Sequence, residues 1–235
     1  MLELKRMPAV RFLCDSSKCS NGEALPFPKT WTEELILEWL QLKGYLTLSN
    51  VRLKSGRRGG IEEADIIGLR LHQRPDPESK AMVEVLEVLH IEVGVLARRF
   101  EEVLKAVQKK LAQEREEAIK SLAVDVVELE SVYGKAIYGF SRYDVSRIEY
   151  KRVFVVDGVA KGQVSRLKEE LGKYGIEFKT LGEVLREVIH DVDEWKRRQV
   201  EKGFRTTKQI TLPESLWLLN LIDCMKREGL IAEGP

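Results

Sequence analysis

The sequence has few cysteines and no apolar run long enough to cross a membrane. Its 235 residues include three cysteines, Cys14, Cys19 and Cys224, an odd and sparse set that fits a reducing compartment better than a disulfide framework. The start, Met1 to Arg6, lacks the apolar stretch of a signal peptide, and no run approaches the roughly 20 apolar residues of a membrane helix. We therefore expect a cytoplasmic protein without a membrane partner.

Several catalytic signatures are missing as well. No Gly-x-x-x-x-Gly-Lys sequence is present, no Gly-x-Gly-x-x-Gly turn follows an expected strand, and only three histidines are available for Ser-His-Asp catalysis. Charge, by contrast, is plentiful: 33 % of the residues are charged, with a formal net charge of +1. Because the two signs nearly cancel, any nucleic-acid site must be a local basic patch.

Hydrophobic periodicity predicts an α/β protein with three parts. These are an irregular segment over 1–29, a main domain over 30–200 and a helical extension over 201–235. The extension is expected to pack on the main body or on a second subunit. Packing on a second subunit would make the protein a homodimer, which is the assembly we expect. The expected helices are 30–44, 96–121, 163–174, 183–199 and 215–227, and the expected strands are 45–53, 64–71, 82–93, 152–158 and 176–181.

Two carboxylates stand inside expected apolar strands, Asp65 and Glu92. An ionised carboxylate is costly to bury unless it is paired or binds a metal. The alternation of a strand places Glu92 and His90 on the same face, where we expect His90 to be a core residue rather than a base. The alternative for Asp65 is an ion pair with Arg70 or Arg98.

The expected elements follow the order helix, three strands, helix, strand, and three short motifs occur in them. They are Glu33 followed by Gly44-Tyr45, then Glu63-Ala64-Asp65-Ile66-Ile67-Gly68, then Leu89-His90-Ile91-Glu92-Val93. Over 31–117, with 152–181 as a continuation, the chain resembles the PD-(D/E)XK nuclease superfamily, which includes the archaeal Holliday-junction resolvases. The resemblance implies a restriction-endonuclease-like core (α-β-β-β-α-β), a mixed sheet flanked by helices with a C-terminal helical extension.

The resemblance also implies a function, metal-dependent phosphodiester hydrolysis of DNA by an endonuclease, with RNA as the other substrate to test. Glu33, Asp65 and Glu92 would hold Mg²⁺ or Mn²⁺, since carboxylate oxygens are the ligands these cations take. Glu38 is the alternative to Glu33 as the acid of the first helix.

The chain departs from the family pattern at Gly94, where the motif has a lysine. Either a cation from elsewhere replaces it, from Lys80, Lys105 or Arg98, or activity is lost. In the second case the chain is a catalytically inactive nuclease-like protein that acts as a DNA-binding or assembly module.

A basic, glycine-rich turn is the expected contact with nucleic acid. Lys54, Arg57 and Arg58 lie in it, and Arg98 opens the helix after Glu92. These side chains would bind phosphates. The alternative for the turn is a solvated hairpin tip, and for Arg98 an ion pair with a nearby glutamate.

Overall fold

The computed structural model describes seven stretches of the chain. They are residues 30–53, 62–95, 100–111, 115–126, 147–157, 161–203 and 210–231. The expected irregular segment 1–29 and the predicted nucleic-acid contacts Lys54, Arg57, Arg58 and Arg98 lie outside these stretches.

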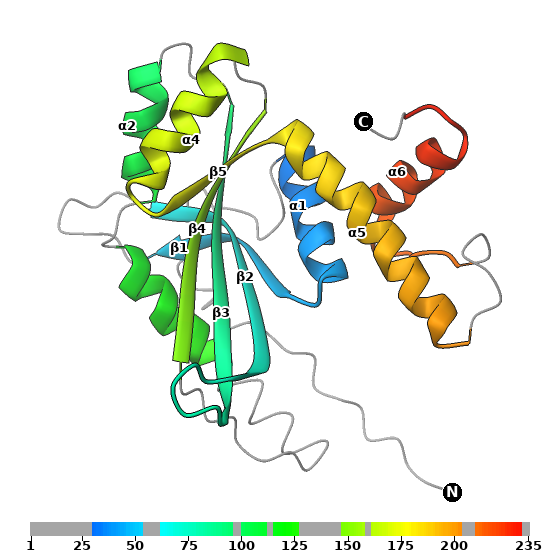
Figure 1. Cartoon of the computed structure of the whole chain (residues 1–235). Helices are drawn as coiled ribbons and strands as arrows, with labels where there is room; N and C mark the ends of the chain where they lie inside the picture. The colour runs from blue at the N-terminus through cyan, green and yellow to red at the C-terminus, as the bar shows by residue number, and fades with distance from the viewer. Residues whose placement is uncertain are drawn as a thin grey trace, which may run out of the picture.

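One mixed sheet of five strands forms the centre of the molecule, with its strands side by side in chain order (Figure 1). The first three strands run antiparallel to one another, and the fourth and fifth run parallel to the third. The strands are β1 (Leu46–Leu53), β2 (Glu62–Pro75), β3 (Met82–Val95), β4 (Arg147–Asp157) and β5 (Ile176–Thr180). The predicted α/β class is confirmed.

Helices cover both faces of the sheet (Figure 1). One face packs against α1, α5 and α6, and the other packs against α2, α4 and a helical segment at 115–126. The bounds are α1 (Trp31–Leu42), α2 (Phe100–Lys110), η1 (Lys161–Gln163), α4 (Val164–Gly172), α5 (Leu181–Glu201) and α6 (Trp217–Arg227). In the described part of the chain, no helix is both long and apolar enough to cross a membrane.

The elements differ from expectation in three places, one of which is β4, which begins at Arg147 rather than at residue 152. The expected single helix over 96–121 is two helical segments, because α2 ends at Lys110 and a second segment runs over 115–126. Strands β2 and β3 are also longer than expected, and their register continues to Pro75 opposite Met82. The added pairs at the end of this ladder include polar residues, such as Gln73↔Glu84. The turn that follows is closed by Asp76, whose Oδ1 accepts hydrogen bonds from the backbone N–H groups of Glu78 and Ser79.

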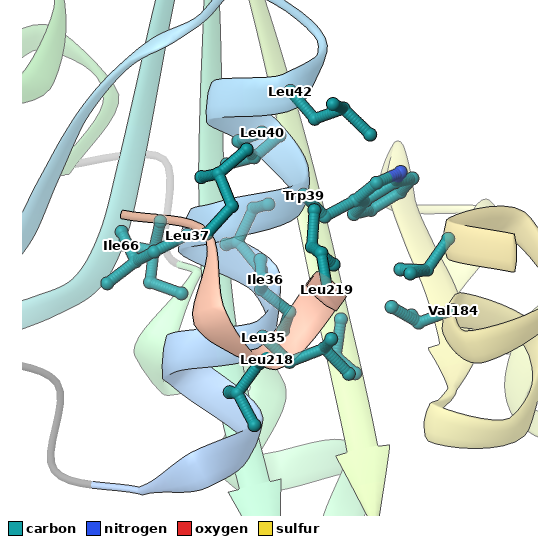
Figure 2. Packing of buried hydrophobic residues seen from close by; sticks show 14 of the residues in the cluster. Leu35, Ile36, Leu37, Trp39, Leu40, Leu42, Ile66, Val184, Leu218 and Leu219 are labelled. Carbon is teal, nitrogen blue, oxygen red and sulfur yellow. The ribbon is translucent and has the colours of Figure 1, made fainter. Parts of the chain in front are cut away.

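The largest apolar cluster lies between the sheet and α1, α5 and α6 (Figure 2). Leu218 and Leu219 of α6 pack in it beside α1, and Trp39 of α1 lies toward α5. The Trp39 indole Nε1–H donates to Asp191 of α5 at 2.8 Å, so the polar edge of this buried ring is satisfied. The C-terminal helix therefore packs on the main body, as one of the two expectations had it.

A buried carboxylate on α1 holds α6 in place. Glu38 is 2 % exposed, and its two oxygens accept hydrogen bonds from the backbone N–H groups of Leu218 (3.1 Å) and Leu219 (2.9 Å). Leu216, the N-cap residue of α6, supplies no side-chain hydrogen bond of its own. Burial raises the pKa of Glu38, and the hydrogen bonds from these amides oppose the rise. Glu38 thus caps α6 from a neighbouring helix.

We expect Glu38→Ala to lower the free energy of unfolding by about 2–3 kcal/mol, because two buried N–H groups lose their acceptor and a cavity is left. Glu38→Gln should cost less at neutral pH, since it keeps one acceptor oxygen and removes a buried charge. Urea unfolding measures both. Glu34→Ala, which truncates the neighbouring, less buried acid, is the control. An equal loss in Glu34→Ala and Glu38→Ala would contradict the cap.

Candidate functional site

The sheet divides at the two predicted acids. β2 and β3 pair with each other from Pro75↔Met82 to Ile66↔Ile91. Beyond that point β2 pairs only with β1, as at Glu62, and β3 pairs only with β4. We call this junction the fork. Its β2 branch is residues 62–65 and its β3 branch is residues 92–95, so each branch carries one of the two predicted strand acids.

Asp65 ties the two branches together at their base. Its Oδ2 accepts a hydrogen bond from the backbone N–H of Val93 at 2.9 Å, so its side chain joins the β2 branch to the β3 branch. The β1–β2 pairing keeps one register through Ser49↔Ile66 and Val51↔Ala64, but Asn50, between them, has φ +49°. Positive φ is uncommon for a residue other than glycine, and asparagine is among those that tolerate it. The β1 backbone opposite Asp65 is thus in a conformation that is unusual for a strand.

Glu92 projects from the β3 branch into the side of the sheet covered by the 115–126 segment. Its side chain is 0 % exposed, and its Oε1 lies 2.9 Å from Nε2 of His90, which is equally buried. His90 Nδ1 lies 2.7 Å from the hydroxyl of Tyr150 on β4. An ionised carboxylate only accepts, so Nε2 carries the shared proton and, in the neutral ring, Nδ1 accepts from Tyr150. Burial raises the pKa of Tyr150, which keeps this donor neutral. The predicted shared face of Glu92 and His90 is confirmed.

A cation reaches the fork from the helical segment 115–126. One guanidinium nitrogen of Arg115, Nη1, lies 3.4 Å from Oε1 of Glu92 and 3.4 Å from the backbone carbonyl oxygen of Glu63. Arg115 therefore contacts both branches. It was not among the residues predicted, although the sequence contains a signal for it. Arg115, Ile119 and Ala123 recur every four residues and are all buried, so a charged residue occupies the apolar stripe of its helix.

Two of the three cations proposed to replace the motif lysine can be located in the structure. Lys80 is in the turn before β3, twelve residues before Glu92, and the stretch of β3 from Met82 to Glu92 alone spans roughly 30 Å. Lys105 is exposed on α2, and Arg98 lies outside the described residues. Among the described side chains, Arg115 is the cation in contact with Glu92.

The structure also gives a reason for the missing lysine. A Cβ atom at Gly94 would lie 2.4 Å from Cζ of Phe154 and 3.0 Å from its Cε2. Phe154 is buried, and its ring stacks on Phe178 at a centroid distance of 6.1 Å. The space that a side chain at position 94 would need is therefore filled by an aromatic ring.

The helix acids lie on the other face of the sheet. Glu33 is in the first turn of α1, where its backbone N–H donates to the Thr30 hydroxyl, and its side chain is 5 % exposed. The other candidate, Glu38, is engaged as the cap of α6. α1 covers the face opposite to the one on which Glu92 projects.

As arranged, these acids do not fit a divalent cation. Mg²⁺ needs several oxygen ligands and room for water, whereas the carboxylate of Glu92 is enclosed and contacts a guanidinium. Among the residues that the structure describes, no three His, Cys, Asp or Glu side chains are grouped so that they could hold a metal ion. Metal binding by Glu33, Asp65 and Glu92 stays a prediction.

A second ionic cluster, centred on Glu87, contains Arg70. Arg70 bonds Glu87 at 2.7 Å, and the same carboxylate accepts from the Tyr45 hydroxyl at 2.8 Å and from Lys151 at 2.6 Å. Burial acts to raise the pKa of Glu87, but the three hydrogen bonds outweigh it and hold the pKa at about 2. Arg70 is thus the partner of Glu87, and the proposed Asp65–Arg70 ion pair is not formed.

No protein-family model matches this chain, and no curated protein does. The structure itself shows an α/β protein with a five-stranded mixed sheet that is flanked by helices, in which β2 and β3 separate at the fork.

Filling the space at Gly94 should destabilise the protein. We expect Gly94→Ala to cost about 1–3 kcal/mol in urea unfolding, because the new methyl group must displace the Phe154 ring. The cost should be smaller in a Phe154→Leu background. The control is Gly182→Ala in α5, which meets nothing within 4 Å and should be neutral or slightly stabilising. Similar effects of the two alanines would show that Phe154 does not fill this space.

Proposed function

We propose that this chain is a nuclease-like protein that binds nucleic acid without cleaving it. The observation that carries the proposal is the state of Glu92. This acid is enclosed, it is bonded by His90 and Arg115, and the position two residues later cannot carry a lysine while Phe154 stays in place. A carboxylate neutralised from inside the protein is available neither to a metal ion nor to a phosphodiester.

The nuclease-like class rests on topology and on the places of the acids. The elements follow the order helix, three antiparallel strands, helical segments, parallel strand, which is the order that the resemblance implies. Asp65 and Glu92 lie on the neighbouring strands β2 and β3 at the point where these separate. A nuclease-like core explains why one acid occurs on each strand at the point where the two strands separate.

Nucleic-acid binding is supported by the places where the predicted basic residues join the fold. Lys54, Arg57 and Arg58 lie in the connection that leaves β1 at Leu53 and returns at the β2 branch of the fork. Arg98 follows the end of β3, the other branch. Both basic segments are therefore attached to the same end of the sheet, and a local patch there is what a chain with a net charge of +1 needs. DNA is the first ligand to test, and RNA is the second.

The second candidate is metal-dependent phosphodiester hydrolysis, with Glu33, Asp65 and Glu92 as ligands of Mg²⁺ or Mn²⁺. The fork favours it, because it brings one acid to each branch. It requires Glu92 to leave His90 and Arg115, and it requires Glu33, which lies on the other face of the sheet, to reach the same ion.

A homodimer is the proposed assembly. Trp217 and Leu221 of α6 are 55 % and 48 % exposed, while Leu218 and Leu219 hold the same helix on the main body. A second copy covering these two side chains would remove apolar surface from water.

One titration tests both functions. Labelled duplex, branched and single-stranded DNA, and RNA, are mixed with the protein in Mg²⁺ or Mn²⁺, and binding and cleavage are read from the same samples. We expect binding that weakens with salt and no cleavage above the level of Asp65→Ala. The double variant Arg57→Ala/Arg58→Ala should flatten the dependence of log K on log salt by about 2, because two phosphate contacts are lost.

The control double variant, Lys173→Ala/Lys202→Ala, removes two exposed cations from other parts of the chain and should keep the wild-type slope. Metal-dependent cleavage that Asp65→Ala abolishes would replace the proposal by the second candidate. No binding to any of the nucleic acids at low salt would reject both.

A further inference from the structure

We propose that Arg115 is an internal cation that takes the place of a divalent metal ion at the fork. The inference goes beyond nucleic-acid binding, since it concerns what holds the two branches together and is true or false whether or not a nucleic acid binds.

The contacts of the guanidinium are those that a metal ion would make. Hard divalent cations take carboxylate and backbone carbonyl oxygens. Arg115 contacts one of each, Oε1 of Glu92 on the β3 branch and the carbonyl oxygen of Glu63 on the β2 branch, both at 3.4 Å. A guanidinium only donates, so it can satisfy oxygens from two strands at once.

Burial makes this cation necessary. The side chain of Glu92 is 0 % exposed and that of Arg115 is 10 % exposed, so the negative charge has little access to water. His90 supplies one hydrogen bond to the carboxylate, while Arg115 also supplies the opposite charge. Removing one partner of a buried ion pair is strongly destabilising, because the other charge stays buried without compensation.

The helix fixes the position of Arg115. Ile119 and Ala123 follow it at intervals of four residues, and both are 0 % exposed in the cluster beneath the 115–126 segment. Arg115 therefore starts from the buried stripe of its helix, and its guanidinium is directed to the fork by the same packing that docks the segment. A metal ion on the Glu92 carboxylate would lie beside a second cation, the Arg115 guanidinium, and the two positive charges would repel each other.

Two consequences separate this role from that of an ordinary docking residue. In the wild type, divalent metal ions should not stabilise the protein, because Arg115 already neutralises Glu92. Once Arg115 is removed, the buried carboxylate should accept a metal ion instead, and the metal should restore stability. A residue that only docks the helix would lower stability without creating a response to metal.

The experiment is thermal unfolding of Arg115→Ala and Arg115→Met with and without Mn²⁺. We expect both variants to unfold about 5–10 °C below the wild type without metal. Mn²⁺ at about ten times its dissociation constant should raise their Tm by about 3–6 °C and leave the wild type unchanged. Methionine keeps much of the apolar stem of arginine, so the Arg115→Met result does not depend on lost packing.

Two controls make the outcome specific. Arg115→Met/Glu92→Gln should lose the Mn²⁺ response, because the carboxylate is gone. Lys120→Met removes a cation that pairs with Glu116 on the same helical segment, and it should show no response to Mn²⁺. If the Arg115 variants are unfolded without metal, recovery of folded protein on addition of Mn²⁺ is the expected result.

The inference is overturned if Mn²⁺ stabilises the wild type as much as the Arg115 variants. It is equally overturned if neither Arg115 variant responds, or if the response survives Glu92→Gln. None of these outcomes bears on nucleic-acid binding, so this inference and the proposed function can fail separately.

Discussion

The burial of one negative charge constrains the centre of this protein. Glu92 lies on the middle strand of a five-stranded sheet with no exposed side-chain surface, and an ionised carboxylate there needs compensation from the protein. Among the described residues, its partners include His90 from β3, Tyr150 from β4 through His90, and Arg115 from the 115–126 segment. The place where β2 and β3 separate and the docking of that helical segment both depend on this network.

Two other buried carboxylates are compensated in different ways, and the comparison shows what is particular to Glu92. Glu38 accepts from the amides at the start of α6, so it joins two helices. Glu87 accepts from Tyr45, Arg70 and Lys151, donors from α1's end, β2 and β4. Glu92 differs because its cation also bonds a backbone oxygen on the opposite branch of the fork. That geometry makes Arg115 resemble a bound ion more than an ordinary ion-pair partner.

The sequence predicted what depends on local pattern. Apolar periodicity located the helices and strands of the described residues to within a few positions, except for the break after α2. The alternation of β3 placed Glu92 and His90 on one face. Contacts between elements distant in the chain could not be read in this way. Glu38 meets α6 180 residues later, and Arg115 meets Glu92 only because a second helical segment docks there.

The departure at Gly94 was visible in the sequence, but its cause was not. Only the packing shows that Phe154 fills the space, and that the cation near Glu92 comes from Arg115 rather than from Lys80 or Lys105. The local sign of Arg115 in the sequence is its position in the apolar stripe of a helix. The glutamates and lysines around it favour the interpretation that this helix face is solvated, so the sign is weak.

The exchange of a metal ion for an arginine is tested most directly by anomalous diffraction from crystals of the wild-type protein soaked in Mn²⁺. We expect no manganese peak at ligand distance, about 2.0–2.5 Å, from the Glu92 carboxylate. Arg115 should still contact Glu92 and the carbonyl oxygen of Glu63. A manganese ion bound to Glu92, with the guanidinium displaced, would contradict it.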